Sequence, residues 1–197
     1  MKITIEVSAR HMHISKHDLE ELFGPDYQLT PVKDLSQPGQ FASKELVNLV
    51  GPKGNIDGVR ILGPEREQTQ IEISETDCFN LGIKPIVRLS GNLEGTSGVA
   101  LEGPHGVTAI EEGVIVAERH IHMHTSDAKK LGLKNGDRVM VDIDGIRDLL
   151  FENIPLRVSD DYATRLHLDT DEANAAFVQN GDQGELIIDR KKWTDKE

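Results

Sequence analysis

The chain has 197 residues, a formal net charge of −12 and 37% hydrophobic residues, which permits a sizeable core in one or two domains. The negative charge and the aromatic content of only 4% argue against nucleic acid as a partner, because that affinity rests largely on Lys, Arg and aromatic stacking. No apolar run approaches the roughly 18 residues of a membrane span, no signal peptide is evident, and the single cysteine excludes a disulfide framework. We therefore expect a cytoplasmic protein without a membrane partner.

The first half of the chain predicts short strands separated by turns. Residues 1–7 alternate apolar and polar side chains, as a half-buried strand does. A short helix is predicted at 17–23, stopped by Gly24-Pro25, and 24–44 is rich in turn formers, which indicates a loop with short strands. Further strands are predicted at 46–50, 59–62, 68–74, 86–89, 99–101 and 107–110.

The second half continues in the same style. Strands are predicted at 114–123, 138–144, 149–158 and 185–188, and residues 190–197 form a polar tail. Many short strands with regularly spaced turns favour β-barrels or sandwiches over βαβ units, with the few short helices plugging barrel ends. The pattern alone would place a simple domain boundary near Gly113.

Two His-x-His segments stand out. Alternate side chains of a strand point to one face, so His11 and His13 share a face, and so do His120 and His122. Imidazole is the commonest protein metal ligand and suits zinc. Both segments follow an arginine, Arg10 or Arg119, and they lie 109 residues apart, which indicates an internal duplication.

The duplicated unit ends in a helix start, and it occurs four times. In each copy a possible metal ligand lies two residues before a presumed helix N-cap. An acidic residue follows the cap three positions later, which is a capping-box signature. The ligands in these four places are His13, Glu72, His122 and His167. Adding His11 and His120 gives two trios, His11, His13 and Glu72, and His120, His122 and His167. Each trio leaves a coordination position open, as catalytic zinc sites do.

Two further residues have ordinary alternative interpretations. His124 occupies the cap position of its copy, so it could support the metal ligands from behind or simply cap the helix. Cys78 falls in a predicted helix, where a buried structural thiol is favoured over a nucleophile.

Four motifs together carry a family resemblance over about residues 3–188. ARHMHIS, GPEREQTQIEIS, ERHIHMH and LHLDTDEANAA are similar, in this order, to segments of the PduL-type phosphotransacylases, or phosphate propanoyltransferases. The resemblance implies a mainly β chain with two packed small β-barrel domains, 10–117 and 118–190, the second completed by strand 1–9. It implies two zinc ions near the domain interface, one at each trio, and assigns Arg66 to phosphate.

The implied reaction transfers a propanoyl or acetyl group between coenzyme A and inorganic phosphate, with zinc as cofactor. We expect direct attack by phosphate, with Arg66 as the catalytic and phosphate-binding arginine, since a guanidinium fork matches phosphate. Arg10, Arg119 and Arg165 could assist, although alternation puts Arg10 and Arg119 on the face opposite the histidines. A homodimer and cooperation with an acetate or propionate kinase are also expected.

Two rival functions fit the same histidines, a zinc-dependent hydrolase of a thioester or phosphate ester and a non-catalytic, metal-stabilised binding barrel. Some relatives carry an N-terminal extension that directs them into bacterial microcompartments. The first predicted strand begins within a few residues of Met1, so we expect no such extension here and a cytoplasmic location.

Overall fold

The computed structural model describes residues 1–188, and the predicted polar tail at 190–197 lies outside them. The described chain is mainly β, with fourteen strands and four short helices, which confirms the predicted fold class. It divides into two compact units, Ala9–Glu118 and a second unit that combines Met1–Ser8 with the residues from Arg119 onward. Within the described part, no helix has the length and apolar character needed to cross a membrane.

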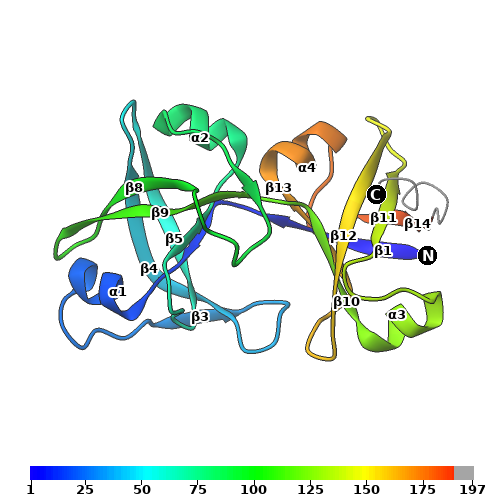
Figure 1. Cartoon of the computed structure of the whole chain (residues 1–197), viewed down its shortest axis with the longest axis horizontal. Helices are drawn as coiled ribbons and strands as arrows, with labels where there is room; N and C mark the ends of the chain where they lie inside the picture. Colours follow the sequence, from blue (N-terminus) through cyan, green and yellow to red (C-terminus); the bar gives the residue numbers. More distant parts are fainter. Residues whose placement is uncertain (189–197) are drawn as a thin grey trace. The chain divides into compact units, whose positions relative to one another are not determined.

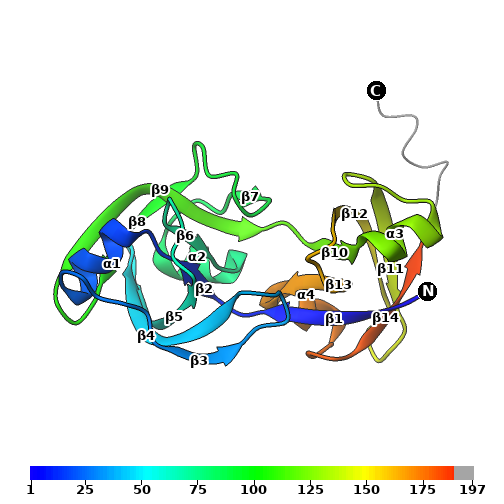
Figure 2. The same cartoon turned by 90° about the horizontal axis from the view of Figure 1, so that it is seen from below.

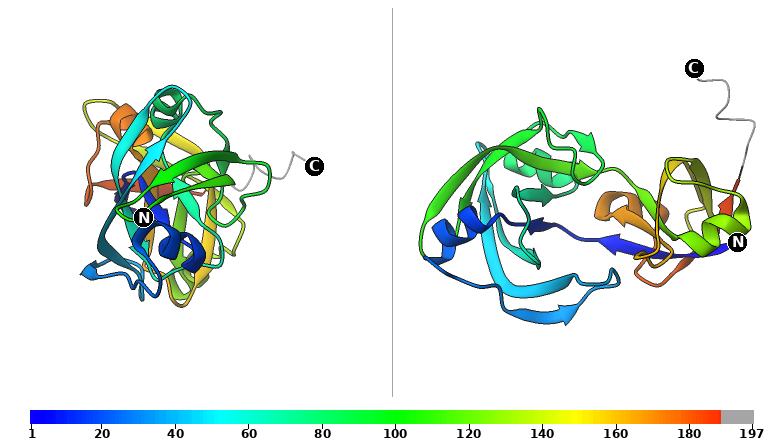
Figure 3. Two further views of the ribbon diagram at one scale, coloured as in Figure 1. Left: turned by 90° about the vertical axis from the view of Figure 1, so that its left-hand side faces the viewer. Right: turned by 60° about the horizontal axis from the view of Figure 1, so that its bottom comes forward.

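The unit of residues 9–118 contains a closed ring of six strands. These strands are β2 (His11–His13), β4 (Phe41–Val50), β5 (Asn55–Gly63), β6 (Gln70–Glu72), β8 (Ser97–Glu102) and β9 (Val107–Ala117). They pair in the order β4–β5–β2–β6–β9–β8 and back to β4. Two more strands, β3 (Pro31–Asp34) and β7 (Val87–Arg88), add to β4 and β9. The long strand β9 curves along this barrel (Figure 3).

The second unit contains a closed barrel of six strands as well. They are β1 (Lys2–Ser8), β10 (His120–His124), β11 (Arg138–Ile143), β12 (Leu149–Ser159), β13 (Arg165–Asp169) and β14 (Gln183–Ile187). The ring runs β1–β13–β10–β12–β11–β14 and back to β1. The N-terminal strand β1 therefore closes the barrel formed by the C-terminal part of the chain (Figure 1).

The two barrels repeat the same pattern of pairing. Each His-x-His strand, β2 or β10, is parallel to one neighbour and antiparallel to the other. The strand that precedes it in the chain, β1 or β9, belongs to the other unit's barrel (Figure 2). The structure thus contains two copies of one folding unit that exchange their first strands.

Four helices follow the four ligand-bearing strands, as the duplicated motif predicts. They are α1 (Lys16–Phe23), α2 (Glu75–Leu81), α3 (Thr125–Leu131) and α4 (Thr170–Ala176). Their N-caps are Ser15, Ser74, His124 and Asp169, and each cap side chain accepts a hydrogen bond from a backbone N–H in the first turn. A cap of this kind satisfies one of the orphan donors at a helix start.

Several strand boundaries differ from the sequence prediction. The single strand predicted at 114–123 is interrupted, because β9 ends at Ala117 and β10 begins at His120. Strand β4 begins at Phe41 rather than at Leu46, because the residues after the turn pair with β3 and β5. The predicted break after Ile110 is absent, and β9 continues through Gly113. Gly113 has φ = 130°, and an added Cβ would lie 2.6 Å from the backbone oxygen of Thr69. This glycine therefore permits a close backbone approach within a strand instead of ending it.

Candidate metal centres

Simple strand geometry brings each ligand trio together. In the first unit His11 lies directly opposite Glu72 on the antiparallel neighbour, and in the second His120 lies opposite His167. Directly opposed residues have Cβ atoms about 5 Å apart, and the second histidine of each His-x-His pair shares their face. Residues in between, such as Met12 and Ile121, are fully buried in the two separate cores.

The structure therefore places all six predicted ligands in two clusters. Within each cluster the candidate ligand atoms all lie within 4.8 Å of one another. His11, His13 and Glu72 form the first triad, and His120, His122 and His167 form the second. Either triad could hold a metal ion, because imidazole nitrogens and carboxylate oxygens at this spacing can share one ion.

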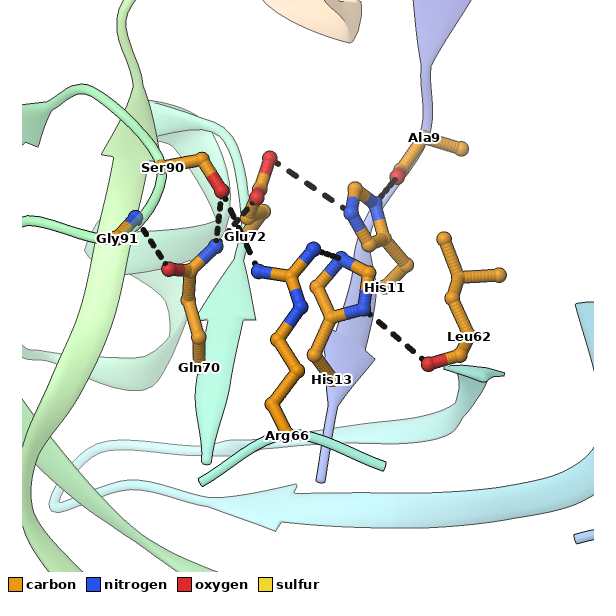
Figure 4. A network of polar contacts seen from close by, with 9 residues as sticks. All are labelled: Ala9, His11, His13, Leu62, Arg66, Gln70, Glu72, Ser90 and Gly91. Atoms are coloured by element: carbon orange, nitrogen blue, oxygen red, sulfur yellow. Dashed lines mark hydrogen bonds and ion pairs between the residues drawn. The ribbon is translucent and has the colours of Figure 1, made fainter. Parts of the chain in front are cut away.

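The first triad has its imidazole rings oriented by backbone carbonyls (Figure 4). The Nδ1 atom of His11 lies 2.9 Å from the Ala9 oxygen, and that of His13 lies 3.2 Å from the Leu62 oxygen. A carbonyl can only accept, so each Nδ1 carries the proton and each Nε2 presents a lone pair. This is the arrangement that metal-binding histidines use. Glu72 lies beside them, with Oε2 3.6 Å from His11 Nε2.

Arg66 lies against the first triad. Its Nη2 donates to His13 Nε2 at 2.9 Å, and its Nη1 lies 3.5 Å from the Ser90 hydroxyl. The guanidinium group therefore faces the same lone pair that a metal would use. An anion bound between the guanidinium group and a metal-loaded triad would be stabilised by positive charge on both sides.

Sequence reasoning missed two polar residues of this cluster, Gln70 and Ser90. Gln70 is 1% exposed, and its Nε2 donates to Glu72 Oε1 at 2.5 Å and to the Ser90 hydroxyl at 2.7 Å. Its Oε1 accepts from the Gly91 N–H at 2.7 Å. Gln70 could have been found, since it precedes Glu72 by two residues and so shares its face. Ser90 lies in a loop, where no periodicity points to it.

The second triad is built from three histidines. The ring centroids of His120 and His167 are 5.0 Å apart and nearly parallel, and His122 is 4.7 Å from both. The ring of Tyr162 stacks on His122 at 4.1 Å, a contact that sequence reasoning also missed. The buried Nε2 atom of His167 has no hydrogen-bond partner. A buried polar atom without a partner is costly, and a metal ion would satisfy it.

The electrostatic environment keeps one imidazole of each triad neutral. Burial, followed by the charges of Arg66 and His11, lowers the pKa of His13 to about 3. Burial, followed by His120 and His122, lowers the pKa of His167 well below its usual value. Metal binding requires the deprotonated ring. The donor set, the carbonyl-oriented rings and the unpartnered His167 atom all fit a divalent metal.

The remaining candidates have other roles. His124 caps α3, and its Nδ1 accepts from the Ser126 N–H at 3.1 Å. Arg10 and Arg119 bind carboxylates, Asp77 at 2.8 Å and Glu172 at 2.6 Å. Cys78 is buried in α2.

Comparisons with known proteins give one consistent family. The family model described as phosphate propanoyltransferase matches residues 4–179. A phosphate propanoyltransferase of Thermotoga maritima is 55% identical over 181 residues, covering 91% of this chain and 86% of its own. Those of Sebaldella termitidis and Enterococcus faecalis are 49% and 48% identical, covering 92% and 93% of this chain and 86% and 87% of their own. By this similarity along nearly its whole length, the chain belongs to the phosphate propanoyltransferase family.

Proposed function

We propose that this chain catalyses acyl-CoA + phosphate ⇌ acyl phosphate + CoA, with a propanoyl or acetyl group transferred. The observation that carries the proposal is the position of Arg66, whose guanidinium lies 2.9 Å from His13 in a triad suited to metal. With a metal bound at this triad, the combination would provide an anion site beside a Lewis acid. Family membership supplies the class of reaction.

The two triads are proposed to hold one zinc ion each. The donor sets are His11, His13 and Glu72 in one unit, and His120, His122 and His167 in the other. A metal bound at such a site acts as a Lewis acid toward a phosphate or carbonyl oxygen. The metal identity rests on ligand chemistry, because imidazole and carboxylate ligands suit zinc but do not select it alone.

The residues of the first cluster have separable tasks in this proposal. Arg66 binds a phosphate group and orients one of its oxygens, since its planar fork of donors matches that ion. Gln70 holds the Glu72 carboxylate in place, and the carbonyls of Ala9 and Leu62 hold the two imidazoles. A metal on His13 Nε2 would occupy the lone pair to which Arg66 Nη2 now donates. The Nη2 group would then be able to donate to phosphate instead.

The chemical step is a direct displacement. A phosphate oxygen attacks the thioester carbonyl carbon, a C–O bond forms, and the C–S bond breaks. The electron pair of that bond leaves with sulfur, and the coenzyme A thiolate then takes a proton from solvent. No thiol nucleophile of the protein is required, which agrees with the burial of Cys78.

The decisive experiment measures thiol release from acetyl-CoA and propanoyl-CoA with and without phosphate, with identification of the acylated product. Phosphate-dependent release with formation of acyl phosphate is expected. Thiol release without phosphate would instead indicate a thioester hydrolase, and phosphate release from a phosphate ester would indicate a phosphoesterase. Metal binding without turnover of any substrate would indicate a non-catalytic barrel. Comparing the two acyl-CoA substrates also measures the preferred acyl group.

The proposal extends to partners and location. An acyl phosphate can pass its phosphoryl group to ADP, so an acetate or propionate kinase would suit as the next enzyme. A homodimer in a reducing cytoplasm completes the proposal, and a sequence with a single cysteine suits that compartment. Sedimentation of the metal-loaded protein tests the oligomeric state.

A further inference from the structure

The ladders that align the triads are short. Strands β2 and β6 pair over three residue pairs, and β10 and β13 pair over three as well. A shift of one residue in such a ladder would turn every side chain to the opposite face. Something beyond these few backbone hydrogen bonds must therefore hold the register that brings the third ligand opposite the first.

One end of each ladder is tied by a threonine. In the first unit the N–H of the α1 cap residue, Ser15, donates to Thr69 Oγ1 at 2.9 Å, and the Thr69 hydroxyl donates to Asp18. An ordinary capping box would return that N–H to the acid at the third helical position. Here the threonine, which lies three residues before Glu72, is inserted between the two groups.

The second unit repeats the same device. The N–H of the α3 cap residue, His124, donates to Thr164 Oγ1 at 3.0 Å, and the Thr164 hydroxyl donates to Asp127 Oδ2 at 2.8 Å. Thr164 also lies three residues before the third ligand, His167. Each threonine thus uses its one donor and an acceptor lone pair to join the two ligand strands.

The opposite end of each ladder is tied by an arginine. Arg10 binds Asp77 through Nε at 3.0 Å and Nη2 at 2.8 Å, and Arg119 binds Glu172 through Nη1 at 2.6 Å. Each arginine immediately precedes the first histidine of its triad. Each acid stands at the third position of the helix that follows the third ligand.

The sequence separations confirm that these ties are equivalent. The arginine ties span 67 and 53 residues, and the threonine ties span 51 and 37. Both differences equal 14 residues, so a single difference in length between the two copies accounts for both. Both copies of the unit therefore carry both ties around a metal-suited triad.

We propose that Thr69 and Thr164, with Arg10 and Arg119, are positioning residues that set the geometry of the triad in their own unit. This inference rests on the proposed metal sites. The four residues bond helix starts and acids rather than the metal ligands, and they act by fixing the strand that carries the third ligand. A consequence is selectivity, because each tie should affect one metal and leave the other unchanged.

The test measures Zn²⁺ affinity by competition with a chromophoric chelator. Thr164→Val is nearly isosteric but lacks the hydroxyl. It should lower the affinity for one of the two zinc ions about tenfold, which is at the low end of the effect of removing a residue that supports metal ligands. Thr164→Ser keeps the hydroxyl and should stay within about twofold of the parent. Thr4→Val, in strand β1 of the same unit, is the matched control and should bind both equivalents normally.

A ligand knockout identifies the affected site. In a His167→Gln background only the first triad remains, so adding Thr164→Val should change nothing, whereas adding Thr69→Val should weaken the remaining zinc. If Thr164→Val does not fold, Arg119→Lys tests the other tie of the same triad and should weaken the same equivalent.

Several outcomes would overturn the inference. Suppose that the parent binds two zinc ions and that Thr164→Val either binds both normally or binds both with equally lowered affinity. The inference then fails, while the proposed metal sites stand. It also fails if Thr164→Ser is as defective as Thr164→Val, because the hydroxyl would then be irrelevant. A parent that binds no zinc would instead refute the proposed metal sites, and the inference with them.

Discussion

Replacing Arg66 by alanine is the sharpest test of the proposed phosphate site. The guanidinium contacts His13 Nε2 at 2.9 Å and the Ser90 hydroxyl at 3.5 Å. Because a metal would compete with Arg66 for that His13 lone pair, the substitution should not reduce metal content. We therefore expect Arg66→Ala to fold, to keep its metal and to lose catalysis.

The magnitude follows from one lost charge-assisted bond. Hydrogen bonds to charged groups are worth about 1.5–3 kcal/mol, and each 1.36 kcal/mol is a factor of about ten in rate. The expected loss in kcat/KM for phosphate is therefore about 10- to 150-fold. Arg66→Lys should recover only part of it, since an ammonium group cannot form the bidentate fork.

The assay is steady-state kinetics with phosphate varied at saturating acyl-CoA, together with metal analysis of the same samples. Arg138→Ala provides a control for the loss of one positive charge. That half-buried arginine lies in the unit that does not contain Arg66, and it donates to the Asn153 carbonyl of its own unit. Unchanged phosphate dependence in Arg66→Ala, with metal content intact, would show that Arg66 does not bind phosphate. Loss of metal in the variant would refute our view that Arg66 and the metal compete for the lone pair on His13 Nε2.

Three more results are expected. Exhaustive chelation should remove about two metal ions per chain and abolish activity, with recovery on adding zinc; full activity in the metal-free protein would contradict the metal proposal. Cys78→Ser should keep most activity, because Cys78 is buried in α2; an acyl adduct trapped on Cys78 would disprove this. Burial by itself raises the pKa of Glu45, but hydrogen bonds led by those from Thr30 outweigh it and hold the pKa below its usual value. Glu45→Gln should therefore cost about 1.5–3 kcal/mol of unfolding free energy at pH 7, and urea titrations should show the difference shrinking below about pH 4. A difference that grows on acidification would reverse the sign of our argument.

The exchange of first strands has a consequence for how the chain must be dissected. A fragment cut at residue 118 would leave β1 without β13 and β14, and would leave the second barrel without its closing strand. Open sheet edges of this kind promote aggregation. Experiments on one metal site are therefore best done by point substitution in the full chain.

The sequence by itself determined the local parts of each site. A period of two places His11 with His13 and His120 with His122 on one strand face, and the four ligand-to-cap spacings predict where the helices begin. Both signals are local, because they depend only on strand pleat and on the orphan N–H groups of a helix start.

Only the tertiary structure decided which strands are neighbours. The sequence proposed Glu72 and His167 from the repeated motif, whereas the ladder places them directly opposite His11 and His120. Gln70, in strand β6, bonds Ser90, which lies in a turn after β7 where no periodic signal points to it. The ties between Thr69 and Asp18 and between Arg10 and Asp77 join residues 51 and 67 positions apart. Such contacts depend on barrel closure and strand register, which are set by packing of distant segments and leave no mark in the local pattern of one chain.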